Sequence, residues 1–255
     1  MKLRILLVTL LAIGSAFAQD KPWPMPPPLA PVPAGVNNAA YAVPRMEWIG
    51  NVQTNVEKAH APGTKVDLIF DGDSITAGWQ STGRSIWNEH YGKLNAFDFG
   101  IAGDGTQHLL WRLIEGKQAD GLHPKLIVLM IGTNNLSNTA DQVADAIKRI
   151  VAEYQKRCPE AVILLQAILP RGEQPANNPH RDKNKVINQT LAKFADGKKV
   201  IFIDFGDKFL NPDGTIIADL MPGFLHPSAK GYQIWADAIQ PIINQYFPAA
   251  STAKP

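Results

Sequence analysis

Short apolar runs alternate with longer segments of helical periodicity along most of the chain. The apolar runs are, in chain order, 66–70, 96–99, 126–131, 161–168 and 200–204. Runs of this length, bounded by turn residues, are typical of buried strands. Strands that alternate with helices predict a parallel sheet with helices packed on both faces. We therefore expect one α/β domain built on a central parallel sheet of about five strands.

The helical segments carry signals at their ends. The clearest one is 139–154, where apolar side chains form a single stripe. Thr139 followed three residues later by Gln142 forms a capping box at its start. A last helix is expected to begin near Ser228, and Pro241 should kink or divide it.

The first residues predict the compartment. Lys2 and Arg4 precede the apolar run 5–13, and small residues follow it up to Ala18. This pattern is typical of a signal peptide over residues 1–18 that is cleaved after Ala18, and the run is too short to span a membrane. We expect a secreted or periplasmic protein without an integral membrane segment after cleavage. Cleavage removes two positive charges from the formal +2, leaving 2 − 2 = 0, which argues against nucleic acid as a partner.

The remaining chain reads as one domain with two appendages. The proline-rich stretch 21–35 makes residues 19–44 an N-terminal arm or linker, and residues 249–255 form a C-terminal tail. The domain is expected over 45–248, and no repeat or second domain is visible. Cys158 is the single cysteine, so no internal disulfide is expected. No cluster of His and Cys has metal-ligand spacing, so no metal is expected.

Polar clusters follow the predicted strands and precede the last helix. They are Gly72-Asp73-Ser74, the glycine-rich 100–106, Gly132-Thr133-Asn134-Asn135, and His226. Ligands bind at the carboxyl ends of parallel strands, which is where the first three clusters lie. A serine nucleophile needs an adjacent base, and a side-chain amide suits an oxyanion site. From these residues alone, a capping role for Ser74 and a packing role for the glycine-rich turn stay open.

These clusters resemble, in the same order, the sequence blocks of the SGNH/GDSL hydrolases, which are named for Ser, Gly, Asn and His. The similarity is most detailed with the alpha subunits of intracellular platelet-activating-factor acetylhydrolase and their bacterial relatives. It includes residues 99–108, 110–113 and 169–172, and it covers roughly 66–247. The resemblance implies a flavodoxin-like three-layer α/β/α sandwich.

The resemblance also implies roles for particular residues. Ser74 would be the nucleophile and His226 its general base. The backbone N–H groups of Ser74 and Gly103, with the Asn134 side chain, would form the oxyanion hole. No cofactor is implied. The acetylhydrolase relatives dimerise, which leaves a homodimer open for this chain.

One position departs from the family pattern. Most members have an aspartate three residues before the histidine, and this chain has Gly223 there. Three alternatives stay open: a backbone carbonyl within 221–224 takes over the orienting role, Asp219 substitutes for the acid (Asp204, at a strand end, is less favoured), or the chain is catalytically crippled. Changing the orienting carboxylate lowered kcat about 10⁴-fold in a serine protease. We therefore expect a Ser–His dyad of reduced activity.

The expected function is a secreted serine esterase that removes short acyl groups, acetyl above all, from carbohydrate or other small esters. The alternatives are an impaired hydrolase-like module that binds acetylated glycan, and a lysophospholipase or thioesterase. Asp73, Trp79 and Arg171 are candidates for the substrate pocket. Core packing of Trp79 and an ordinary solvated charge at Arg171 stay open.

Overall fold

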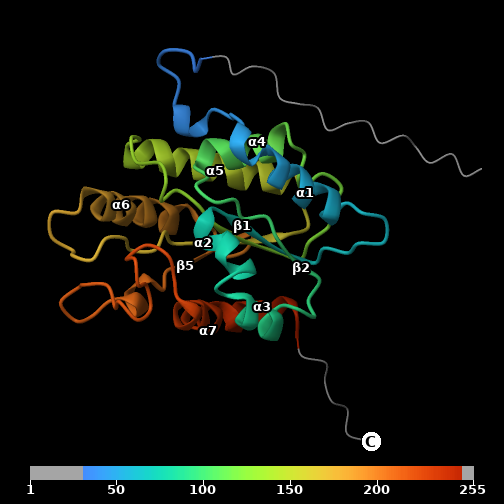
Figure 1. The fold of residues 1–255 in the computed structure, drawn as a ribbon. Helices are drawn as coiled ribbons and strands as arrows, with labels where there is room; N and C mark the ends of the chain where they lie inside the picture. The colour runs from blue at the N-terminus through green and yellow to red at the C-terminus, as the bar shows by residue number, and fades with distance from the viewer. Residues whose placement is uncertain (1–30, 249–255) are drawn as a thin grey trace, which may run out of the picture.

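Figure 1 shows a central sheet between two layers of helices. In this computed structural model, residues 31–248 are described. The predicted signal peptide, the first part of the proline-rich arm and the C-terminal tail lie outside the described residues. Among the described residues, no helix combines the length and apolar character needed to cross a membrane.

The sheet contains five parallel strands, as the apolar runs predict. They are β1 (Leu68–Gly72), β2 (Ala96–Asp98), β3 (Leu126–Met130), β4 (Val162–Gln166) and β5 (Val200–Ile203). Their order is β2-β1-β3-β4-β5, so β1 and β3 lie inside the sheet and β1 separates β2 from β3. Every residue of β1 and β3 is buried, which explains why these strands read as near-continuous apolar runs. The fold class predicted from the sequence is confirmed.

The helices cover both faces of this sheet. The α-helices are α1 (Ile49–Ala59), α2 (Ser74–Ala77), α3 (Arg84–His90), α4 (Thr106–Ile114), α5 (Ala140–Arg157), α6 (Pro179–Phe194) and α7 (Ala229–Tyr246). Short 3₁₀ helices are η1 (Asn38–Ala40), η2 (Met46–Trp48), η3 (Gly78–Gln80) and η4 (Gly206–Phe209). One core cluster joins the sheet to α4, α5 and α6, and a second joins the opposite face to α2, α3 and α7 (Figure 1). The arrangement is a three-layer sandwich.

The helix signals in the sequence have mixed outcomes. The capping box is present, because Thr139 accepts a hydrogen bond from the Gln142 backbone and the Gln142 side chain accepts one from Thr139. Ser228 is the N-cap of α7, as expected. Pro241 does not divide α7, which continues through it to Tyr246. A helix packed along its length against the core tolerates the loss of one backbone hydrogen bond at a proline.

The described part of the arm lies on the domain. The Asn37 side chain donates to the backbone oxygen of Gln142 at 2.9 Å, and the Thr106 hydroxyl donates to that of Ala39 at 2.7 Å. The Ala39 side chain is fully buried. The arm therefore contacts α4 and α5 ahead of the first long helix.

Candidate active site

Ser74 and His226 come together at the carboxyl edge of the sheet. The Ser74 Oγ and the His226 Nε2 are 2.8 Å apart, which is hydrogen-bond distance. Ser74 begins α2 directly after β1, and His226 lies just before the N-cap of α7. The hydroxyl of Tyr232 on α7 donates to the backbone oxygen of Ile75 at 2.7 Å, so α7 is tied to α2 next to Ser74. Two residues far apart in sequence are thereby held as a pair.

The turn that presents Ser74 depends on Gly72 and Asp73. A Cβ at Gly72 would lie 2.2 Å from the backbone oxygen of Met130, so only glycine fits between β1 and β3 here. Asp73 caps α2, because its carboxylate accepts a hydrogen bond from the Ile75 N–H at 2.9 Å. The chain can therefore turn sharply out of the sheet with the Ser74 side chain only partly covered.

Backbone donors lie on the two loops beside Ser74. The N–H groups of Ser74 and Gly103 donate to no acceptor within residues 31–248. Gly103 has φ +76, a conformation that favours glycine, and its N–H lies on the loop between β2 and α4. That loop is attached to the end of β1 beside Ser74, because the Ile101 N–H donates to the backbone oxygen of Gly72 at 3.2 Å. Free N–H groups of this kind are what an oxyanion requires.

The two adjacent asparagines have different tasks. Asn134 is partly exposed, and its amide donates to the backbone oxygen of Asp104 at 3.0 Å, one residue from Gly103. Asn135 is buried. Its amide oxygen accepts a hydrogen bond from the Thr106 N–H, and its amide nitrogen donates one to the Thr106 hydroxyl, both at 3.0 Å. Asn134 is thus placed beside the glycine loop at the site, and Asn135 fixes the start of α4.

A buried ionic network supports these loops from below. Arg112 on α4 forms ion pairs with Asp71 and Asp104, each at 2.9 Å. The same guanidinium donates to the backbone oxygen of Gly72 at 3.2 Å and to that of Phe99 at 3.1 Å. One side chain therefore joins the ends of β1 and β2 to the glycine loop. The sequence alone gave it no role beyond its place in a resembling motif.

Burial shifts the titration of the acids under the site. It raises the pKa of Asp73 to about 7 and that of Asp104 to about 6, and Arg112 opposes the shift at Asp104. His226 is classed as exposed, but its partial burial still lowers its pKa, and the positive charge of Arg171 lowers it further. His226 is therefore neutral at neutral pH, which is the state a general base needs.

Comparison with known proteins identifies the family of this chain. The family described as GDSL-like Lipase/Acylhydrolase matches residues 70–234. The chain belongs to the GDSL-like lipase/acylhydrolase family. The human platelet-activating factor acetylhydrolase IB subunit alpha1 is 40% identical over 167 residues, which cover 65% of this chain and 70% of that protein.

Solved structures share the fold. A GDSL-like lipase from Bacteroides thetaiotaomicron is 22% identical with a TM-score of 0.60, covering 76% of this chain and 98% of its own. A catalytic mutant of Axe2, an acetylxylan esterase from Geobacillus stearothermophilus, is 20% identical with a TM-score of 0.54, covering 76% and 99%. The family match over residues 70–234 includes Ser74, Gly103, Asn134 and His226.

Within residues 31–248, no side chain takes the place of the usual acid of the GDSL-like hydrolases. His226 has no second hydrogen bond within the described residues, so neither a carbonyl of 221–224 nor a carboxylate bonds its other ring nitrogen. The Asp219 carboxylate is 69% exposed and pairs with Lys230 at 2.5 Å, so it does not take the orienting role that one of the three alternatives gave it. A surface cation holds Asp219 instead.

The pocket candidates are also placed. Trp79 does not line a pocket, since it is fully buried among Phe70, Tyr232 and Trp235, at ring distances of 4.6 to 5.9 Å. Asp73 is 2% exposed and serves as a helix cap, so it is not a surface contact either. Arg171 is the candidate that lies partly exposed beside the site.

Arg45 is a neighbour of the site that sequence reasoning missed. It lies outside the family match, just before η2, and its Nη1 donates to the backbone oxygen of Ala102 at 2.7 Å. That oxygen belongs to the same peptide unit as the Gly103 N–H. A Cβ at Gly103 would lie 2.4 Å from the Arg45 Nη1, so the guanidinium packs directly on the glycine. Only a proximity in space, which no local pattern encodes, reveals this contact.

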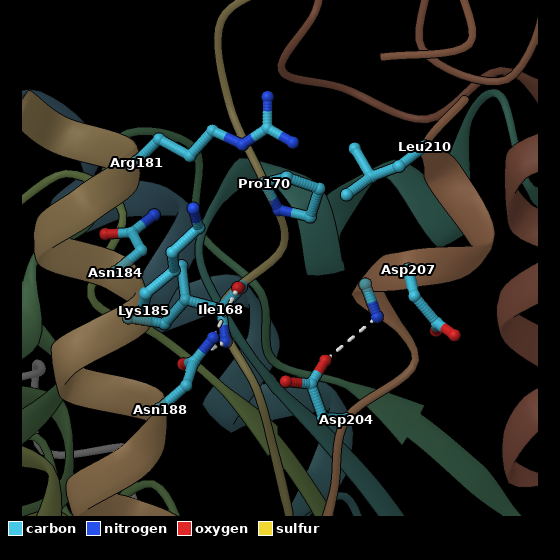
Figure 2. Close-up of a pocket in the computed structure, with 10 residues that line it drawn as sticks. Ile168, Pro170, Arg181, Asn184, Lys185, Asn188, Asp204, Asp207 and Leu210 are labelled. Carbon is cyan, nitrogen blue, oxygen red and sulfur yellow. Dashed lines mark hydrogen bonds between the residues drawn. The ribbon is translucent and has the colours of Figure 1, made fainter. Parts of the chain in front are cut away.

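A separate cavity of about 180 Å³ lies between α6 and the end of β5 (Figure 2). Asp204 lines it, with Oδ1 accepting a hydrogen bond from the Gly206 N–H at 2.9 Å. Asn188 on α6 bonds the backbone of Ile168 on the opposite side. Neither Ser74 nor His226 lines this cavity, so the cavity is separate from the catalytic pair.

Proposed function

We propose that this chain is a serine esterase that removes short acyl groups, acetyl foremost, from carbohydrate or other small esters. The observation that carries the proposal is the Ser74 Oγ to His226 Nε2 distance of 2.8 Å. Beside this pair are two backbone N–H groups without acceptors in the described chain. A nucleophile, its base and oxyanion donors are the parts that acyl transfer requires.

The steps follow from these positions. His226 Nε2 takes the proton as the Ser74 Oγ bonds to the carbonyl carbon of the ester. The negative charge on the carbonyl oxygen is held by the N–H groups of Ser74 and Gly103 and by the Asn134 amide. His226 then returns the proton to the departing alkoxide, and the acyl group stays on Ser74. Water then attacks the acyl carbon and gives a proton to His226, and His226 passes that proton to the Ser74 Oγ as the acyl–oxygen bond breaks and the acid leaves.

The acyl preference is supported by similarity. The curated relatives are named as acetylhydrolases, and one structural neighbour is described as an acetylxylan esterase. Export is supported by the predicted signal peptide. For that proposal the test is N-terminal sequencing of exported protein, which should begin at Gln19; recovery of an uncleaved chain from the cytoplasm would oppose it.

The decisive experiment measures hydrolysis of p-nitrophenyl esters of increasing acyl length by the mature protein. Acetate should be cleaved with the highest kcat/KM, and Ser74→Ala should lose more than about 1000-fold of the activity. Ser85→Ala, an exposed serine on α3, is the matched control and should retain activity. A Ser74→Ala protein as active as the parent would overturn the proposal, and a maximum at long acyl chains would favour a lysophospholipase or thioesterase.

A second function is favoured by one observation. His226 has no carboxylate on its second ring nitrogen within the described chain, so base strength and orientation are both weakened. The corresponding function is a hydrolase-like module that binds acetylated glycan without turnover. Equal affinity of the parent and Ser74→Ala for an acetylated oligosaccharide, with no ester cleaved by either, would establish it.

A further inference from the structure

Arg171 presents a guanidinium that is only partly engaged. Its Nη1 donates to the backbone oxygen of Thr133 at 2.6 Å and lies 3.2 Å from the Thr133 hydroxyl. Nε and Nη2 donate to no acceptor in the described chain, and neither atom is sealed from solvent. One edge of the guanidinium is therefore anchored and the other is open.

The anchored edge fixes Arg171 between the loops of the site. Thr133 directly precedes Asn134, the proposed oxyanion donor. The next residue, Gly172, donates its N–H to the backbone oxygen of Phe224 at 2.8 Å, two residues before His226. Arg171 is therefore held between the loop that carries Asn134 and the loop that carries His226. Its positive charge also lowers the pKa of His226.

Arg171 has no carboxylate partner among residues 31–248. In contrast, Arg112 is paired with two carboxylates and Arg45 with Glu47 at 2.7 Å. The charge of Arg171 also acts on Asp73, but that acid has a pKa of about 7 and is partly protonated at neutral pH. The open edge of Arg171 therefore has no anion of its own in the described chain, and an anionic group of a ligand could bind there.

A second cation reinforces the field on the same side. Lys183 donates to the backbone oxygens of Asn135, Leu136 and Asn138 at 2.7, 2.9 and 3.1 Å. Its pKa is lowered by burial and by the nearby charge of Arg171. Lys183 has no carboxylate partner among the described residues either, so two positive charges flank the loop that carries Asn134.

We propose that the ester cleaved at Ser74 carries an anionic oxygen group, a carboxylate or a phosphate, which binds the open edge of Arg171. The inference rests on the proposed esterase function and names its substrate class. The planar guanidinium donates two parallel N–H bonds to such a group, a geometry that a lysine ammonium does not reproduce. The site would then select acetylated acidic sugars or acetylated phosphate esters over neutral esters.

Binding to the Ser74→Ala protein tests the proposal without turnover. The ligands are a mono-O-acetyl methyl glucuronoside and its carboxamide, and acetylglycerol phosphate and acetylglycerol, measured by calorimetry. At least one acid should bind about 10- to 100-fold more tightly than its neutral counterpart. Arg171→Gln in this background should remove the difference, and Arg84→Gln, an exposed arginine on α3, should keep it.

The outcomes separate charge recognition from loop support. If Arg171→Gln weakens the acid and the neutral ligand equally, Arg171 only braces Thr133 and the proposal is wrong. Equal affinity for acid and neutral ligand, or no measurable binding of either acid, also overturns it. The preferred acid identifies the source of the anion as a uronate or a phosphate.

The esterase proposal is judged by a separate measurement. If the parent cleaves p-nitrophenyl acetate through Ser74 but Ser74→Ala shows no preference for an acid, only the anionic substrate is excluded. If no ester is cleaved but an acid preference depends on Arg171, the anion site stands and the esterase fails. The two proposals therefore fail in different ways.

Discussion

Replacing Gly223 with aspartate should raise the kcat/KM of ester hydrolysis. Gly223 lies three residues before His226. At this position most of the hydrolases that the chain resembles have an aspartate. A Cβ built at Gly223 meets no atom within 4 Å, and the residue is not in the left-handed region. The backbone therefore accepts an aspartate side chain without strain, and the substitution adds a carboxylate on the loop that presents the base.

The size of the gain follows from what the structure already supplies. An orienting carboxylate both aligns the imidazole and stabilises the imidazolium. Alignment is partly present, since the ring of His226 already lies 2.8 Å from the Ser74 Oγ. Two unit charges about 4 Å apart attract by about 1 kcal/mol in water and about 4 kcal/mol at an effective dielectric of about 20.

Solvent screening decides where in that range the value falls. His226 is an exposed residue, so the lower half of the range applies. The lower half of the range is about 1–2.5 kcal/mol, and about 1.4 kcal/mol corresponds to a factor of 10, so we expect kcat/KM to rise by about 5- to 60-fold. This is well below the roughly 10⁴-fold effect of the buried carboxylate in a serine protease.

The assay compares Gly223→Asp with Gly223→Asn, which has the same size but no charge. Both are measured on p-nitrophenyl acetate from pH 5 to 9, after circular dichroism shows that they fold. The new carboxylate raises the pKa of His226, so the acid limb of the pH profile should move to higher pH. If the two variants are equally active, the missing charge does not limit catalysis and the reasoning is refuted.

Asp219→Asn should have the same activity as the parent, because the Asp219 carboxylate pairs with Lys230 and makes no hydrogen bond with His226.

Three further outcomes follow from the buried charges. Arg171→Gln removes a cation that lowers the pKa of His226, so the acid limb of kcat/KM should shift to higher pH; an unchanged profile would contradict this. Arg112→Met leaves two carboxylates buried without a counter-charge, so it should reduce the free energy of unfolding by about 3–5 kcal/mol. In calorimetry this should lower Tm by roughly 6–20 °C, and an unchanged Tm would show that the ionic network contributes nothing to stability. Burial raises the pKa of Asp98 from 3.8 to about 8, so between about pH 4 and 8 the folded state retains a proton that the unfolded chain loses, and stability falls as pH rises. In urea titrations at a series of pH values, Asp98→Asn should show a smaller fall in the free energy of unfolding; a fall equal to the parent's would oppose the reasoning.

The architecture could be predicted because parallel strands that are buried on both faces appear in the sequence as short apolar runs. Each apolar run contains one strand, and the polar residues after β1 and β3 lie at the edge where sites form. The pairing of Ser74 with His226 was foreseen from a family resemblance. No pattern within either segment shows that α7 is tied to α2 through Tyr232.

Burial of particular side chains could not be predicted, because it depends on distant elements. Trp79 is five residues from Ser74, which favoured a pocket role, but Trp235 of α7 packs against it at 5.0 Å and places it in the core. Asn134 and Asn135 are identical in type and adjacent in sequence. Only the position of Thr106, nearly thirty residues away, decides that Asn135 fixes a helix and leaves Asn134 at the site.

The charges around His226 favour a substrate that brings its own anion. In the described chain the ring lacks a carboxylate and experiences the positive charge of Arg171, so forming the imidazolium is less favourable than in a full triad. An anionic group bound to the open edge of Arg171 would offset that charge and raise the pKa of His226 when the ester is in place. The same contact that selects the substrate would therefore strengthen the base. It follows that Gly223→Asp should help neutral esters more than acidic ones, because an acidic ester already supplies part of the missing negative charge.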